Sequence, residues 1–115
     1  MTICTKNGDR SVNFGTSTVW DLFVAMLHKN IKDFDDEFPN VLAFFTTFRC
    51  NSDCSVKTAS QLKAIRKILG EIPSDRPGIS CAEYFTTVDG DDLITGLIEL
   101  LEYSAQNNTD VIPCF

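Results

Sequence analysis

The chain has 115 residues and a mass of 12.8 kDa, a length that predicts one domain, residues 1–115, around a single core. Apolar residues make up 43% of it and charged residues 23%, as in ordinary globular proteins, which excludes wholesale disorder. The net charge of −6 argues against direct binding to nucleic acid or to an anionic membrane, because such binding depends on Lys and Arg.

Two short β-rich runs open the chain, residues 2–6 and 11–16, and Asn7-Gly8 between them predicts a hairpin. A helix is predicted over residues 18–31, capped by Ser17 or Thr18. Its apolar side chains recur at helical spacing and would form one stripe: Trp20, Phe23, Val24, Leu27 and Ile31. The acidic residues 32–38 follow as a polar connector.

Two further helices are predicted from the spacing of apolar residues. The first is short and begins near Phe38-Pro39, because proline is tolerated in a first helical turn. The sequence NSDC, residues 51–54, then breaks the pattern. The second helix covers residues 56–72, with Ser55 or Thr58 opening it, and its inner side is formed by Leu62, Ile65, Leu69 and Ile72.

The last third begins with a proline-containing loop, after which β-branched and aromatic residues favour a strand over residues 79–88. Asp89-Gly90 turns the chain, and Asp91 is the expected cap of a helix over residues 92–106. Residues 110–115 predict a closing strand, which Pro113 either confines to an edge of the sheet or brings to an end. This order predicts an α+β fold with about four helices packed against a small, mainly antiparallel sheet.

Membrane segments, export signals and cysteine usage together predict the compartment. No segment approaches the roughly 20 apolar residues of a spanning helix, and the N-terminal residues show no export signal. An odd number of cysteines without a signal peptide predicts reduced thiols rather than a disulfide framework. We therefore expect a cytoplasmic protein whose thiols are reduced and mostly buried: Cys4, Cys50, Cys54, Cys81 and Cys114.

No motif for catalysis, for a cofactor or for a metal emerges. The only histidine, His28, has no local signature of a nucleophile and an orienting group. Cys50 and Cys54 are too loosely spaced for a structural zinc site, and residues 88–92 lack the spacing of a calcium-binding EF-hand loop. A phosphate-binding glycine loop is also absent. We expect a protein that is not an enzyme and has no catalytic residues, cofactor or metal.

Four carboxylates crowd the stretch KDFDDEF, residues 32–38. They are either a solvated, self-repelling loop or a docking surface for a cationic partner, while acid–base chemistry or metal binding is a third reading. Phenylalanines among the charges favour docking, because an apolar anchor would hold a partner that the charges steer. The predicted partner-binding residues are Asp33, Phe34, Asp35, Asp36 and Glu37, with Asp89, Asp91 and Asp92 as a second acidic candidate.

Several motifs occur together in a recognisable order. They are Phe38-Pro39 before a short helix, the run Leu62-Lys63-Ala64-Ile65-Arg66 within the next helix, and Phe85, Thr87, Gly90, Asp92 and Leu93 ahead of the last one. Over about residues 38–115 the chain resembles the small immunity proteins of bacterial polymorphic-toxin and contact-dependent growth inhibition systems. In particular, it resembles the family catalogued as immunity protein seventy.

The resemblance implies an antitoxin in the cytosol of the producing cell, which binds one cognate toxin domain and blocks its active site. We expect a basic RNase as the toxin, because a nuclease carries a basic groove for phosphates. The charge alone indicates only that the partner is basic. Two alternatives stay open, a small regulatory or adaptor subunit acting through oligomerisation and a thiol enzyme built on Cys50, Cys54 or Cys81.

Overall fold

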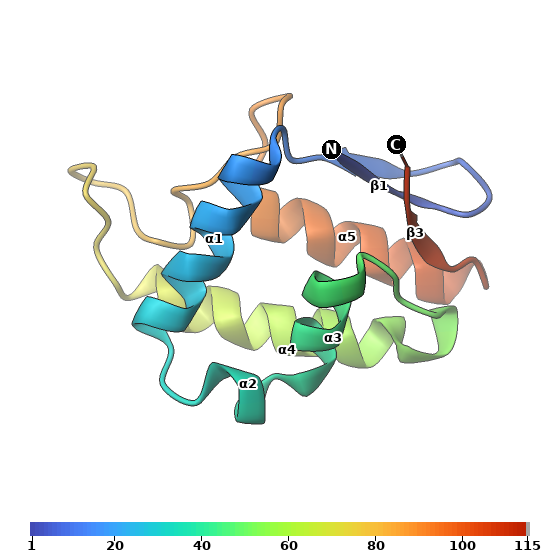
Figure 1. The fold of residues 1–115 in the computed structure, drawn as a ribbon, viewed down its shortest axis with the longest axis horizontal. Helices are drawn as coiled ribbons and strands as arrows, with labels where there is room; N and C mark the ends of the chain where they lie inside the picture. The colour runs from blue at the N-terminus through green and yellow to red at the C-terminus, as the bar shows by residue number, and fades with distance from the viewer. Residues whose placement is uncertain (115) are drawn as a thin grey trace.

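The computed structural model describes residues 1–114, which form a three-stranded antiparallel sheet and five helices (Figure 1). The α+β fold is therefore confirmed. In chain order the elements are β1 (Thr2–Thr5), β2 (Ser11–Asn13), α1 (Ser17–Asn30), α2 (Phe34–Glu37), α3 (Pro39–Thr47), α4 (Ser52–Gly70), α5 (Leu93–Gln106) and β3 (Val111–Pro113).

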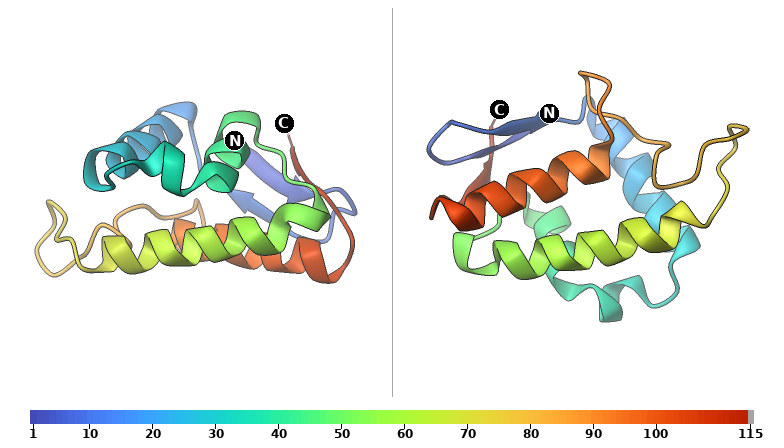
Figure 2. Two further views of the ribbon diagram at one scale, coloured as in Figure 1. Left: turned by 90° about the horizontal axis from the view of Figure 1, so that it is seen from below. Right: turned by 180° about the vertical axis from the view of Figure 1, so that it is seen from behind.

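Helices α4 and α5 pack against each other, side by side and antiparallel, and together they form one layer of the molecule. Helices α1, α2 and α3, with the sheet next to them, form a second layer that covers one face of α4 and α5 (Figure 2). Between the layers lies the core, whose fully buried leucines include Leu62 and Leu69 of α4 and Leu97 and Leu101 of α5. The helical spacing of these residues was readable in the sequence.

The sheet has the order β2-β1-β3, with β1 in the centre. Ile3 of β1 pairs with Val12 of β2 on one side and with Pro113 of β3 on the other. The predicted hairpin is confirmed, and so is the position of Pro113 in an edge strand, where its missing N–H costs no ladder bond. Phe115, which the predicted closing strand included, lies outside the described residues.

Helix α4 begins at Ser52, so the prediction that residues 51–54 break the helical pattern is wrong. The reason is a distant contact: the N–H of Ser52 donates a hydrogen bond of 2.9 Å to Oδ1 of Asp110. A carboxylate there satisfies a free N–H of the first turn and complements the helix dipole. Helix α1 starts one residue earlier than predicted, capped by Thr16, whose side chain accepts from the N–H of Val19.

The predicted strand over residues 79–88 is also wrong, because this segment consists of turns and isolated bridges. Most of its backbone hydrogen bonds join neighbouring turns, as where the N–H of Cys81 donates to the carbonyl of Ile72 at 2.8 Å. One reaches the sheet, from the N–H of Val88 to the carbonyl of Asn13 in β2 at 2.9 Å. Some of the residues that suggested a strand pack in the core individually, whereas Val88 is exposed. Phe85, for example, packs edge-on against Phe23 of α1 with 5.5 Å between the ring centroids.

The expectation that all five cysteines are reduced thiols is wrong for two of them. Cys4 in β1 and Cys114 after β3 form a disulfide, with their Cα atoms 5.9 Å apart. The sheet explains the pairing, because β3 runs beside β1 and the N–H of Cys114 donates to the carbonyl of Thr2. Sequence alone does not place the two ends of the chain on neighbouring strands.

Candidate functional site

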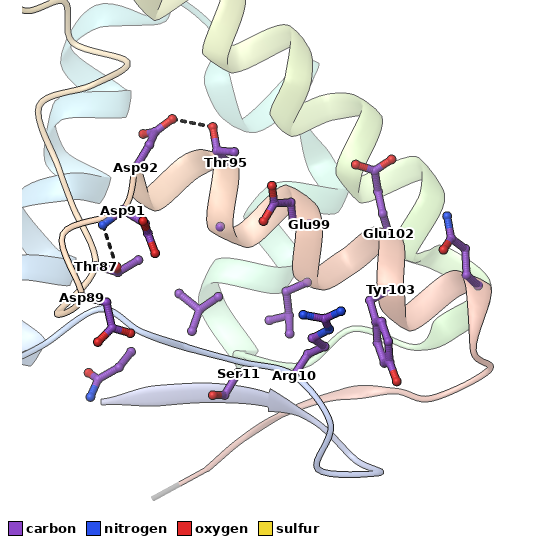
Figure 3. Close-up of a pocket in the computed structure, with 15 residues that line it drawn as sticks. Arg10, Ser11, Thr87, Asp89, Asp91, Asp92, Thr95, Glu99, Glu102 and Tyr103 are labelled. Carbon is purple, nitrogen blue, oxygen red and sulfur yellow. Dashed lines mark hydrogen bonds between the residues drawn. The ribbon is translucent and has the colours of Figure 1, made fainter.

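An open groove of about 680 Å³ lies between β2, helix α5 and the loop of residues 87–92 (Figure 3). Among its lining residues Arg10 is the one cation, whereas five are carboxylates: Asp89, Asp91, Asp92, Glu99 and Glu102. The groove with these lining residues is called the acidic groove below. It contains the whole second acidic candidate predicted from the sequence and adds two glutamates that the sequence analysis missed.

Helix α5 presents one face to the core and another to the acidic groove. Leu97 and Leu101 lie on the buried face, whereas Thr95, Glu99 and Glu102 follow one another at helical spacing on the groove side. A glycine, Gly96, stands where α5 meets β2, so this part of the helix covers little of the groove floor. Alternation of core and surface positions thus places the glutamates beside the loop carboxylates.

The side chain of Asp92 is bonded within the fold and is only partly exposed. Its Oδ2 accepts hydrogen bonds from Nε of Arg66 at 2.9 Å and from the hydroxyl of Thr95 at 2.5 Å, and its side chain is 20% exposed. Asp92 also occupies the N-cap position of α5, so the prediction that Asp91 caps this helix is wrong. Because Arg66 neutralises it from α4, Asp92 adds little to the negative charge of the groove.

Asp89 and Asp91 are exposed, and neither forms an ion pair within residues 1–114. The loop that carries them is held by short backbone contacts. The N–H of Thr87 donates to the carbonyl of Asp91 at 2.7 Å, and the N–H of Asp91 donates to the hydroxyl of Thr87 (Figure 3). Gly90 has a φ of 88°, which permits the turn. Two carboxylates are thereby fixed at one end of the groove with their charges unneutralised.

The opposite end of the groove contains an aromatic ring between charges. The guanidinium of Arg10 lies 5.1 Å from the ring centroid of Tyr103, whose hydroxyl donates to Asp9 at 2.7 Å. The hydrogen bond to this carboxylate raises the pKa of Tyr103 above its ordinary value. Glu102 is paired with Lys63 of α4 at 3.3 Å, on the exposed surface. Positive charge in the groove is therefore confined to this end.

A charge signal in the sequence could have identified the missed glutamates. After Arg76 the chain has no Lys or Arg, yet residues 77–115 hold seven of the sixteen carboxylates. The net charge of −6 is thus carried by this segment, because the first 76 residues contain ten cations and nine carboxylates. Helix α5 and the preceding loop lie within it.

The first acidic candidate lies on and just before helix α2, a short helix where a connector had been expected. Asp33, Asp35, Asp36 and Glu37 are all exposed. Figures 1 and 2 place α2 at the end of the molecule away from the sheet, so the structure does not bring the two acidic candidates together. The carboxylates of α2 form a separate surface, called the α2 surface below.

Asp35 on the α2 surface is tied to helix α1. Nε2 of His28 lies 2.9 Å from Oδ1 of Asp35, and its Nδ1 lies 3.0 Å from the carbonyl of Val24. The hydrogen bond to Asp35 raises the pKa of His28 above its ordinary value, and the backbone carbonyl adds to this effect. The other three carboxylates form no ion pair within residues 1–114. Of the four, Asp35 is therefore already partly neutralised when the histidine is protonated.

The prediction of Phe34 as an anchor for a partner is wrong. Its side chain is 2% exposed and packs between His28, at 5.0 Å, and Phe38, at 5.9 Å between ring centroids. In a helix, residues one position apart point in different directions, so Phe34 turns inward while the carboxylates beside it face water. The phenylalanines of this stretch fix α2 to the core.

The three cysteines outside the disulfide differ in their surroundings, and Sγ of Cys50 lies 3.6 Å from the hydroxyl oxygens of both Ser55 and Thr58. Cys50 and Cys81 are buried and Cys54 is exposed. Within residues 1–114 no three His, Cys, Asp or Glu side chains converge in a way that could hold a metal ion. None of the helices described is both long enough and apolar enough to cross a membrane.

Comparison with known proteins returned no match to a protein-family model, to a curated protein or to a solved structure. The resemblance to immunity proteins therefore stays a prediction that rests on the motifs quoted above.

Proposed function

We propose that this chain is an immunity protein, a non-enzymatic inhibitor that binds a cognate toxin domain and blocks its active site. The toxin is a basic nuclease of the RNase kind. The acidic groove carries the proposal, because three of its five carboxylates, Asp89, Asp91 and Glu99, form no ion pair within residues 1–114 and line one open surface. The α2 surface offers a second contact to the same cationic partner.

The chemistry of a nuclease explains why such a groove would inhibit it. An RNase binds the phosphates of its substrate with Lys and Arg, and carboxylates at similar spacing compete for these cations. Complementary charge raises the rate of encounter and selects the partner, whereas lasting affinity comes from contacts that lose their water. The acidic groove would therefore steer the toxin toward this chain and orient it.

The proposed location is the cytosol of the producing cell, where the toxin would otherwise act. The Cys4–Cys114 disulfide argues against this part of the proposal, because cytosolic thiols are mostly kept reduced. An inhibitor that works there must keep its fold and its acidic groove without this bond. Both cysteines lie on the sheet side, and neither lines the groove.

Growth rescue tests the function directly. The toxin to test is the C-terminal domain of a large exported protein, where the adjacent open reading frame encodes one. Expression of that domain alone should stop growth, and co-expression of this chain should restore it. In the matching assay, an equimolar amount of the purified chain should abolish cleavage of RNA by the purified domain. Unchanged RNA cleavage with a saturating excess of the chain would overturn the proposal.

Charge reversal tests the assignment to the acidic groove. The double variant Asp89→Lys, Asp91→Lys should lower the association rate with the toxin about tenfold at low salt, with little effect near 0.5 M salt. The matched control is Asp75→Lys, Glu83→Lys, which changes the net charge equally at exposed positions outside the groove. Equal association rates for the two double variants would remove the groove from the interface.

A further inference from the structure

A second open groove, of about 420 Å³, lies between α1 and α3. Unlike the acidic groove it is mainly apolar, and it is called the aromatic groove below. Its floor contains the ring of Trp20, which contacts Phe45 edge-on at 4.9 Å and Phe48 at 5.3 Å between centroids. Val24 and Leu42 are half-buried and line its sides. No segment of residues 1–114 fills it.

The aromatic groove continues toward the α2 surface. His28 and Phe34 line the groove, and both contact α2: His28 through Asp35, and Phe34 as a member of that helix. Asp21 also lines it. Residues 17–49, which include α1, α2, α3 and the residues just after α3, contain five carboxylates against two Lys and one Arg. An apolar floor is thus bordered by an excess of negative charge.

We propose that the aromatic groove is an anchoring site for an amphipathic, basic helix of the toxin. Its apolar side chains would enter the groove between α1 and α3 while its Lys and Arg side chains meet Asp21 and the carboxylates of the α2 surface. This inference rests on the proposed function, since the toxin is the partner that it names. It also replaces Phe34 as the source of apolar contact, because the anchor belongs to the partner and the receiving pocket to this chain.

Physical reasons favour this arrangement. Binding energy at protein interfaces concentrates in a few apolar anchors that fill pockets, with charged residues around them. Amphipathic helices bind other proteins by laying an apolar face into such grooves. The charges at the border select the partner's sign, because an acidic helix would place like charges together. The acidic groove has no comparable aromatic floor, so the anchor and the steering surface are different parts of the chain.

Two neighbouring threonines provide a matched pair of variants. Thr46 lines the aromatic groove and Thr47 does not, yet both are exposed in α3 and both donate to the carbonyl four residues earlier. Thr46→Arg should weaken toxin binding at least about tenfold in calorimetry, whereas Thr47→Arg should remain within about twofold of the unsubstituted chain. Because both variants add the same charge, net charge does not explain a difference. Equal affinities would overturn the proposal.

A filling variant tests the same site without a change of charge. Ala25 in α1 lines the groove and Ala64 in α4 does not, and both are exposed. Ala25→Trp should occupy the groove and weaken toxin binding at least about tenfold, whereas Ala64→Trp should not. Circular dichroism would verify that each variant is folded. If toxin inhibition keeps its full potency in Ala25→Trp, the groove proposal fails while the proposed function stands.

A probe peptide tests the groove even if the toxin proves to be the wrong partner. The probe is a helical peptide with leucines at every third or fourth position and lysines elsewhere, and its control replaces the lysines with glutamates. Trp20 is the only tryptophan of the chain, so its fluorescence reports occupation of the groove directly. We expect a saturable change in emission with the lysine probe, at least about tenfold weaker binding of the glutamate probe, and loss of the signal in Thr46→Arg. Equal binding of the two probes, or no saturable change, would refute the inference.

Discussion

The Cys4–Cys114 disulfide should contribute a large part of the stability of this chain under oxidising conditions. The two residues are 110 positions apart, so the bond closes nearly the whole chain into one loop. By the chain-entropy relation, a loop of this length removes unfolded conformations worth about 4.8 kcal/mol at 25 °C. Domains of this size have free energies of unfolding of about 5–15 kcal/mol, so the double variant Cys4→Ser, Cys114→Ser should lose a substantial share.

Urea unfolding followed by Trp20 fluorescence measures this contribution. With a urea slope near 2 kcal/mol per molar, the double variant should unfold at about 2 M lower urea than the unsubstituted chain in non-reducing buffer. In buffer with a reducing agent the two should unfold together, because the bond is then absent from both. Cys54→Ser, which removes an exposed unpaired thiol, should match the unsubstituted chain in either buffer. Coinciding curves without reductant, or five titratable thiols in the unfolded non-reduced chain, would refute the reasoning.

Three further variants test single contacts by the same unfolding measurement. The hydrogen bond to Asp35 raises the pKa of His28 above its ordinary value of 6.5. The pair therefore stabilises the fold fully below pH 6.5, and this stabilisation is lost as the pH rises through the raised pKa of the folded state. The free energy of unfolding of Asp35→Asn should therefore be lower by up to about 1 kcal/mol at pH 5.5, a small amount because the pair is exposed, and almost unchanged at pH 8.5. A loss of stability that does not depend on pH would contradict this. Ser104→Ala deletes a buried hydroxyl that donates to the carbonyl of Thr109 and should cost about 1–3 kcal/mol, and an unchanged midpoint would show that this bond contributes nothing. Gly96→Ala should add about 0.5–1 kcal/mol, because the new Cβ would lie 3.7 Å from its nearest neighbours inside a helix, and a lower midpoint would mean that this space is not available.

Helices α1, α3, α4 and α5 were predictable because their apolar residues repeat with a helical period, and the hairpin because of Asn7-Gly8. Helix α2 is a single turn, too short to show such a period, and was expected to be a connector. The errors have distant causes. The start of α4 depends on Asp110, which lies 58 positions after the N–H that it accepts from. Residues 79–88 have the composition of a strand, but they form turns and meet the edge strand β2 only through the bond from the N–H of Val88 to the carbonyl of Asn13. Strand propensity is a property of one segment. A strand forms only where a second segment pairs along it, and the sequence does not show where in space that second segment lies.

The candidate site was predictable to a similar extent. The sequence identifies every carboxylate, yet it does not say which of them a cation of the fold already neutralises. Arg66 lies 26 positions from Asp92 and turns it into a structural residue, whereas Asp89 and Asp91 close by keep their charge. Glu99 looks like any residue on the polar face of an amphipathic helix until β2 is seen beside it. Phe34 shows the reverse error, since its acidic neighbours concealed a core position.

The distribution of charge also limits how a cationic partner would approach. Helix α4 holds four of the ten cations of the chain and one carboxylate, whereas residues 77–115 hold carboxylates and no cation. A basic toxin would therefore be repelled from the exposed side of α4 and attracted toward the acidic groove, so that its orientation would be selected before contact. Two of the α4 cations, Lys63 and Arg66, are paired with carboxylates of the groove, which leaves the loop at Asp89 and Asp91 as its most negative end. If the steering proposal is correct, that end meets the partner first.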